Sequence, residues 1–254
     1  MIRRLISLLI LCLLAALPAR GEEVVAGLSQ TDVAITTTFK GSEILIFGAV
    51  KRDKPAPEDK LDVIITVSSH LTPVLVRKKE RKLGIWVNAE SAEIDFAPTF
   101  YAIRSTAPLN EILSPAADLQ HSISVPRAIR AHDAQPSGGT RDPFVEAVIR
   151  IRTDQGAYQV QEESIELTED TLFRANVELP SNLTEGDYRT RIFLLRNNQV
   201  IDAYETTLDV RKVGLERWIY NLAHEHSLIY GLLSLIIAIA AGWGASAFFR
   251  LLKN

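Results

Sequence analysis

The sequence predicts a mainly β protein: an immunoglobulin-like antiparallel β-sandwich, as one sandwich or two, with a helical middle segment and one C-terminal transmembrane helix. Three observations predict this class. Apolar and polar residues alternate in short runs along most of the chain, which is typical of half-buried strands. Turn-forming residues separate the runs at short intervals, as in sandwiches. Residues 228–249 form an uncharged run of 22 positions, which is long enough to cross a bilayer as a helix.

Residues 1–21 have the three parts of a secretory signal peptide. Two arginines precede an apolar run over 5–17, and Ala19-Arg20-Gly21 fits a cleavage site before Glu22. The run is too short to span a bilayer. Cleavage would remove the only cysteine, Cys12, and change the formal charge from −3 to −6. An exported, mildly acidic chain without cysteine argues against disulfides, thiolate metal sites and nucleic-acid binding.

Residues 22–106 are expected to form a β-sandwich region of six or seven short strands. The segment 51–60 is rich in charge and proline and predicts an exposed loop. The alternating runs around it cover residues 33–38, 44–48, 63–67, 73–79, 83–88 and 93–101.

Residues 107–156 change character and predict a helical and linker segment. Short helical pieces are expected over 108–113 and 115–120, and 134–140 reads as a flexible linker. The pattern after Asp142 fits a strand or a helix equally well. A cap at Asp142, proline at the next position and Gly156 at the end favour a helix.

Residues 157–213 return to a β pattern that either completes or repeats the sandwich. Strands are expected over 164–167, 172–179, 188–195 and 200–210, with a hairpin turn at 196–199. The stretch from Leu179 to Tyr188 resembles the corner of immunoglobulin-like domains in which a tyrosine hydroxyl binds upstream backbone.

The C-terminal part is expected to anchor the chain in a membrane. Residues 214–227 predict an amphipathic juxtamembrane helix, 228–249 the transmembrane helix and 250–254 a cytoplasmic tail. Arg250 and Lys253 favour a cytoplasmic C-terminus, and the cleaved signal places the preceding domain in the periplasm.

Four short stretches of the sequence resemble those of a known family. They are Gly84-Ile85-Trp86-Val87-Asn88, Phe100-Tyr101-Ala102-Ile103, Gly186-Asp187-Tyr188, and the stretch from Lys212 to Tyr220 with the expected transmembrane helix that follows. In these the chain resembles the alphaproteobacterial "putative transmembrane protein" family, over nearly its whole length. The resemblance implies a single-pass bacterial inner-membrane protein with a helical middle segment and no assigned activity. Through gene neighbourhood it also implies a link to a sulfite-exporter-like permease.

The densest basic cluster comprises Arg77, Lys78, Lys79, Arg81 and Lys82, at a position where a hairpin is expected to turn. It could contact lipid headgroups or an acidic partner. A solvated hairpin tip that discourages edge-to-edge aggregation is the alternative. Trp86, which follows closely, is expected to belong to the core.

Small residues recur at every fourth position of the expected transmembrane helix: Ser234, Ala238, Gly242 and Ser246. A stripe of small side chains lets another helix approach closely in lipid. The alternative is that transmembrane helices are rich in small residues in any case.

No catalytic motif, cofactor site or metal site is predicted. His224-Glu225-His226 is the tightest group of metal-ligating residue types, but a helix would point the two histidines in nearly opposite directions. We therefore expect a non-enzymatic membrane-anchored periplasmic accessory protein that docks onto an inner-membrane protein or self-associates. The alternative is a periplasmic binder of a small anion or metal that delivers it to a permease.

Overall fold

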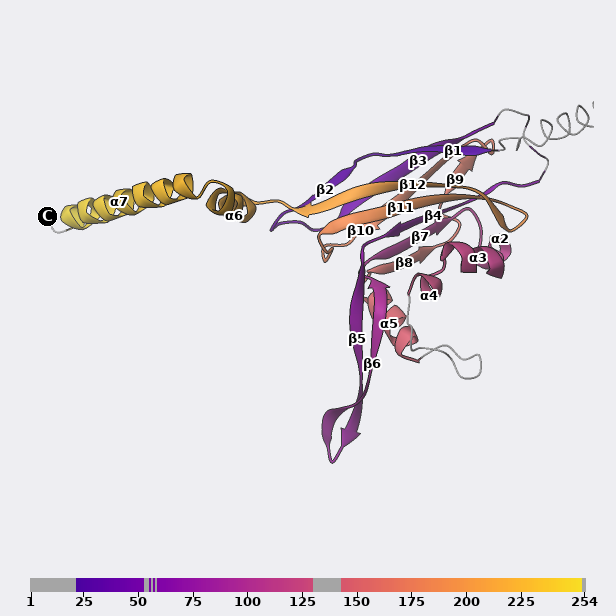
Figure 1. The fold of residues 1–254 in the computed structure, drawn as a ribbon, viewed down its shortest axis with the longest axis horizontal. Coiled ribbons are helices and arrows are strands. Elements are labelled where there is room, and N and C mark those ends of the chain that lie inside the picture. The colour runs from indigo at the N-terminus through magenta and orange to yellow at the C-terminus, as the bar shows by residue number, and fades with distance from the viewer. Residues whose placement is uncertain (1–21, 53–54, 56, 58, 130–142, 253–254) are drawn as a thin grey trace, which may run out of the picture.

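The computed structural model describes residues 22–52, 55, 57, 59–129 and 143–252 (Figure 1). The expected signal peptide 1–21, the linker 134–140, the capping residue Asp142 and the last two residues of the tail lie outside the described residues. Strand is the main secondary structure, and one long apolar helix lies at the C-terminus.

Two sheets face each other. The first contains β1 (Glu23–Leu28), β3 (Ser42–Lys51), β10 (Leu172–Leu179) and β9 (Glu166–Thr168), paired antiparallel in that order. The second contains β2 (Asp32–Ile35), β12 (Gln199–Lys212), β11 (Gly186–Arg196), β4 (Asp62–Ser68), β7 (Tyr101–Ser105) and β8 (Tyr158–Gln161) in that order. Each sheet therefore combines strands from before and after the helical middle segment.

The expectation of a purely antiparallel sandwich is wrong for the second sheet. β12 and β2 are parallel, and so are β7 and β8. Parallel neighbours need a long crossover connection, and the helical middle segment between β7 and β8 supplies one. The sheet is therefore mixed, and an immunoglobulin-like topology is not confirmed.

The described residues of the middle segment form α2 (Leu109–Ile112), α3 (Pro115–His121), α4 (Val125–Ala128) and α5 (Pro143–Asp154). The helix expected before Gly156 is confirmed as α5, and Gly156 has a φ of +69°, which suits a left-handed exit. Ser114 caps α3, because its hydroxyl accepts the amide proton of Ala117 at 3.2 Å.

The six-stranded sheet is buried on both faces of its centre, so the fold has two cores. Ile65, Ile192 and Leu208 point into the sandwich, whereas Ile64 and Phe193 point under the helices, where Val148 of α5 covers them. This explains why β4 is an unbroken apolar run, since side chains on both of its faces are buried.

Buried polar groups hold the ends of the sandwich together. The hydroxyl of Tyr188 donates to the carbonyl of Thr184 at 2.8 Å, as the resemblance to the tyrosine corner predicts. Arg104 is fully buried, and its guanidinium donates to the carbonyls of Ile103 and Asn176 and to the side-chain oxygen of Gln159, at 2.9–3.0 Å. Arg104 thereby links β7, β8 and β10 across the two sheets.

Glu22, the first described residue, is held in place by two arginines. Its carboxylate accepts hydrogen bonds from Arg52 and, at 2.8 and 2.9 Å, from Arg196. Burial would raise the pKa of this carboxyl, but the hydrogen bonds and charges of the two arginines outweigh burial and lower it.

Candidate functional site

The most prominent surface feature is a long hairpin that stands away from the sandwich (Figure 1). Its strands are β5 (Leu71–Lys82) and β6 (Ile85–Pro98), which pair with each other and with neither large sheet. We call this hairpin the arm. Only its base is packed, through Val76, Ile94 and Ala97. The outer half of the arm buries few side chains, so it does not help to form a core. The presence of such a long hairpin therefore needs another explanation.

The tip of the arm exposes large apolar side chains. The two-residue turn Leu83-Gly84 joins the strands, and Leu83 is completely exposed. Ile85 and Trp86 follow at 64% and 68% exposure. The expectation that Trp86 belongs to the core is wrong, because the strands continue past every element that could cover it. We call Leu83, Ile85 and Trp86 the apolar tip.

The turn itself is strained. Leu83 has a φ of +51° and Gly84 one of +87°, so both central residues are left-handed, as in a type I′ turn. Glycine tolerates this conformation, but for leucine it costs about 1–2 kcal/mol. A leucine at this position with a completely exposed side chain is consistent with an external contact.

The basic cluster lies along β5, and the turn follows it at Leu83-Gly84. The expectation that the hairpin turns within the cluster is therefore wrong. Strand alternation divides the cluster between the two faces of the arm. Lys78 and Lys82 share one face with Glu80, and their ammonium groups lie 3.8 and 4.0 Å from its carboxylate. Arg77, Lys79 and Arg81 share the other face, where no ion pair forms within the described residues. Trp86 is directly opposite Arg81.

A groove of about 710 Å³ separates the middle of the arm from α5. Arg77, Lys78 and Lys79 line one side of it, and Phe144 and Ile151 of α5 line the other. The residues of the expected basic cluster therefore lie in two places along the arm. Three of them border this groove, and Arg81 and Lys82 lie next to the apolar tip.

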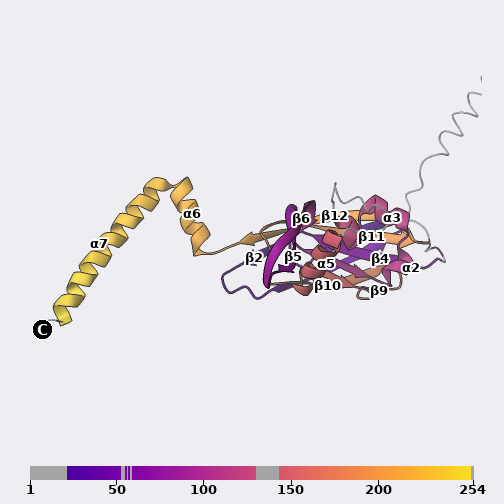
Figure 2. The same ribbon diagram turned by 90° about the horizontal axis from the view of Figure 1, so that it is seen from below.

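The anchor consists of α6 (Leu215–Glu225) and α7 (Ser227–Leu252), which meet at an elbow (Figure 2). α7 has 26 residues, and its stretch Ser227–Ser246 has a mean hydropathy of 2.0 with none of it buried. At 1.5 Å per residue, 20 residues span about 30 Å, the thickness of the hydrocarbon layer. The helix is therefore long and apolar enough to cross a membrane.

The stripe of small residues is divided between two environments. Ser234 and Ala238 line a groove of about 520 Å³ whose other wall is formed by Ile219 and Leu222 of α6. Sequence reasoning missed this packing of α6 against α7. Gly242 does not line this groove, and an added Cβ there would meet open space; Ser246 follows one turn later. The lower half of the stripe thus has room for a second helix.

His224 and His226 do not form a shared site. The ring of His224 stacks on Tyr220, with centroids 4.0 Å apart, and its Nδ1 lies 2.9 Å from the Tyr220 carbonyl. His226 terminates α6. Within the described residues, no group of three or more His, Cys, Asp or Glu side chains is arranged to hold a metal ion.

A polar cavity of about 520 Å³ lies beside the helical layer, and sequence reasoning did not find it. Arg191 borders it and donates to the carbonyls of His121 and Ser122 at 2.7 and 3.1 Å. Arg189 borders it too, paired with Glu205 at 3.0 Å. Burial raises the pKa of the neighbouring Tyr101 to about 12, so its phenol is protonated at neutral pH.

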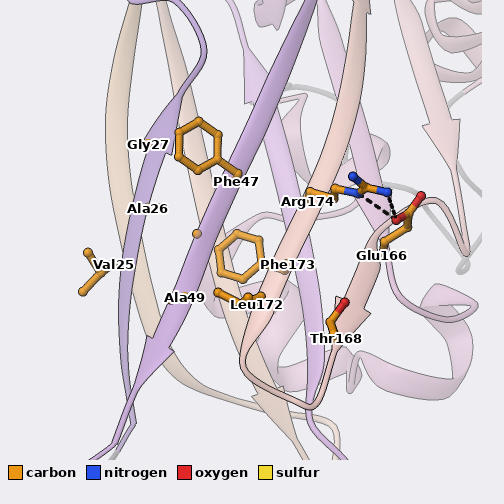
Figure 3. A pocket seen from close by; sticks show the side chains of 11 residues that line it. Val25, Ala26, Gly27, Phe47, Ala49, Glu166, Thr168, Leu172, Phe173 and Arg174 are labelled. Carbon is orange, nitrogen blue, oxygen red and sulfur yellow. Dashed lines mark hydrogen bonds and ion pairs between the residues drawn. The ribbon is translucent and has the colours of Figure 1, made fainter.

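The outer face of the four-stranded sheet carries an apolar groove of about 780 Å³ (Figure 3). Strand register places its side chains in two rows. The first row comprises Val25, Ala49, Leu172 and Thr168, and the second comprises Gly27, Phe47, Arg174 and Glu166. Val25, Phe47 and Leu172 are 46–56% exposed. The signal lay in β3, where Leu45, Phe47 and Ala49 place apolar residues on the face opposite to the buried Ile44 and Ile46.

Comparison with known proteins identifies the family. The family described as "Putative transmembrane protein (Alph_Pro_TM)" matches residues 23–251. The chain belongs to this family. The match covers the two sheets, the arm, the helical segment and nearly all of α7.

Other comparisons add little. No curated protein matches the chain. Among solved structures, the chain is similar to the sporulation control protein Spo0M from Bacillus subtilis, at 10% identity and a TM-score of 0.28. That alignment covers 82% of this chain and 56% of the Spo0M chain. A likeness at this level carries no argument about fold or function.

Proposed function

We propose that the protein is a non-enzymatic, membrane-tethered interaction protein that presents the arm to a partner protein in the same membrane. The signal peptide 1–21 would export the sandwich to the periplasm of a bacterium, and α7 would hold it in the inner membrane with residues 250–254 in the cytoplasm. The observation that carries the proposal is the apolar tip, held far from the core by two strands of 12 and 14 residues.

The composition of the tip supports a protein contact. Aromatic and aliphatic side chains that are exposed when alone and bordered by arginine are typical of interface hot spots. The face with Arg77, Lys79 and Arg81 adds three positive charges without an ion pair in the described part of the chain, which favours an acidic surface on the partner.

The direction of the arm supports a neighbour in the membrane. The arm projects sideways from the sandwich, crosswise to α7 (Figures 1 and 2). If α7 stands along the bilayer normal, the arm extends parallel to the membrane surface and reaches an adjacent protein. The sulfite-exporter-like permease implied by the family resemblance is one candidate for such a partner.

The test is co-purification from native membranes after mild solubilisation. The tip variant Leu83→Ser plus Trp86→Ser would be compared with wild type and with Leu119→Ser. Leu119 is 62% exposed on α3 and serves as a matched control. Wild type and the control should recover the same partner, and the tip variant should recover at most a tenth as much. Equal recovery with the tip variant would refute a role for the arm.

The periplasmic binder of a small anion or metal is the second candidate, and the polar cavity is the observation that favours it. Arg191 has no ion pair within the described residues, and His70 and Ser68 share the cavity with it. A ligand at one hundred times its dissociation constant would add about 2.7 kcal/mol of stability. The melting temperature of the full chain in detergent, scanned with sulfite, sulfate, thiosulfate and divalent metals, separates the two functions. A shift that Arg191→Gln abolishes would favour the binder.

A further inference from the structure

The apolar tip and the apolar groove on the four-stranded sheet are two surfaces that stay exposed within the part of the chain that the structure describes. The tip offers three large side chains on a narrow turn. The groove offers a shallow depression, because the small side chain of Ala49 lies low between Val25, Phe47 and Leu172, while the Phe47 ring lies over Gly27 (Figure 3). A convex apolar tip and a concave apolar site are complementary in shape and chemistry.

Their charges are complementary as well. Arg81 and Lys82 come directly before the turn at the tip. At one end of the groove, the β9–β10 turn carries Glu169 and Asp170, both exposed and without an ion pair in the described part of the chain. Arg174 in the groove is already neutralised by Glu166, at 2.6 Å. Arg52 also contacts this turn, but it donates to the Asp170 carbonyl, to the Thr171 hydroxyl and to Glu22. The carboxylates of Glu169 and Asp170 therefore offer acceptors to the basic border of the tip.

The arm cannot reach the groove of its own chain. β5 follows β4 and β6 precedes β7, so the arm leaves from the six-stranded sheet. The groove lies on the outer face of the other sheet, with the whole sandwich in between. An occupant with the chemistry of the tip must therefore come from another molecule.

We infer that the apolar tip of one copy docks into the groove formed by Val25, Phe47, Ala49 and Leu172 of a second copy, with Arg81 and Lys82 against Glu169 and Asp170. The inference rests on the proposed interaction function and names the partner as a second copy of the chain. The contact is heterologous, because each copy gives a tip and receives one.

The membrane tether makes this arrangement feasible. The strands of the sandwich run along the line that leads to α7 (Figures 1 and 2). The outer faces of the two sheets and the arm are therefore directed away from that line, toward neighbouring molecules. Copies anchored in one bilayer with the same orientation therefore present tips and grooves to one another at a similar height.

The size of the contact predicts that it is weak in free solution. A large aromatic side chain buries about 150–250 Å², so three apolar side chains fall well below the roughly 1,200 Å² of a stable interface. Tethering in one membrane raises the effective concentration of tip and groove and compensates for a small area. The test therefore belongs in native membranes.

The experiment uses two differently tagged full-length copies in the same membranes, and both copies carry Cys12→Ser. One copy carries Asn88→Cys, two residues after Trp86 on the arm, and the other carries Thr168→Cys on the rim of the groove. Both positions are exposed, and neither change removes an apolar or charged side chain of the proposed contact. A short bifunctional maleimide is then added to native membranes that contain both copies. A second pair, Asn88→Cys with Leu119→Cys, is the matched control.

We expect the tip–rim pair to form a cross-linked dimer with both tags, at least fivefold above the control pair. Adding Trp86→Ser to the first copy should reduce it to the control level, and restoring an aromatic with Trp86→Phe should recover it. No dimer above control with the tip–rim pair would overturn the inference. Equal cross-linking of tip to tip, or a blue shift of Trp86 fluorescence on anionic vesicles without any dimer, would overturn it too. If the co-purified partner still depends on the tip in that case, the proposed function survives and the self-docking does not.

Discussion

Leu83→Asn should stabilise the outer half of the arm. Leu83 adopts a φ of +51° at the first central position of a two-residue turn, and its side chain is completely exposed. Asparagine is preferred at this position of type I′ turns, whereas an ordinary L-residue pays about 1–2 kcal/mol for the left-handed conformation. Because no packing is lost, we expect a gain of about 1 kcal/mol in the free energy of opening the tip.

Amide hydrogen exchange of the arm measures this gain directly. One kcal/mol corresponds to roughly a fivefold change in an equilibrium constant, so amides in 78–90 should exchange about fivefold more slowly in the variant. Leu119→Asn, an exposed apolar residue on α3 without a positive φ, should leave arm exchange unchanged. Unchanged or faster exchange in Leu83→Asn would refute the account of the turn. The same variant should bind its partner more weakly, because the apex of the apolar tip is gone.

Three further predictions concern the polar groups that hold the sandwich together. Tyr188→Phe removes the hydrogen bond to Thr184 and should lower the free energy of unfolding by about 1–2 kcal/mol in chemical denaturation; an unchanged midpoint would contradict this role. Arg104→Met removes the buried donor that joins three oxygens across the sheets, and the loss should be about 3 kcal/mol; near-native stability would show that the oxygens find other donors. Glu22→Gln tests a pH dependence. The pKa of Glu22 in the folded state lies below its ordinary value of 4.5. The carboxylate therefore stabilises the fold above that pH, and this stabilisation is lost as the pH falls through the lowered pKa. The melting temperatures of wild type and variant should differ at neutral pH and converge in acid; a constant difference would rule the linkage out.

Elements with local signals were predictable from the sequence. The alternation in 172–179 matches β10, whose side chains are exposed and buried in strict turn. Pro143 and Gly156 correctly favoured a helix where periodicity allowed a strand, because the two ends of a helix have their own chemistry. The turn at 196–199 is confirmed, and Asn197 and Asn198 both have positive φ, as a tight hairpin turn requires.

Features that depend on distant contacts were not predictable in the same way. The parallel pairing of β7 with β8 follows from the path of the helical segment, which no strand pattern encodes. A large aromatic side chain such as Trp86 is usually buried. Only the length of the arm shows that this one lies beyond the elements of the core and is 68% exposed. The apolar groove arises because β1, β3 and β10 become neighbours from three separate parts of the chain. Arg104 in the core likewise needs acceptors from two other strands.

The topology of the anchor is the most direct test of a tethered, exported sandwich. A fluorescent reporter that matures only in the cytoplasm, fused after Asn254, should be bright, and added protease should reach the sandwich only once the outer membrane is opened. The fusion should also stay in the membrane after an alkaline carbonate wash. A dark reporter, or release of the protein by the wash, would contradict the account.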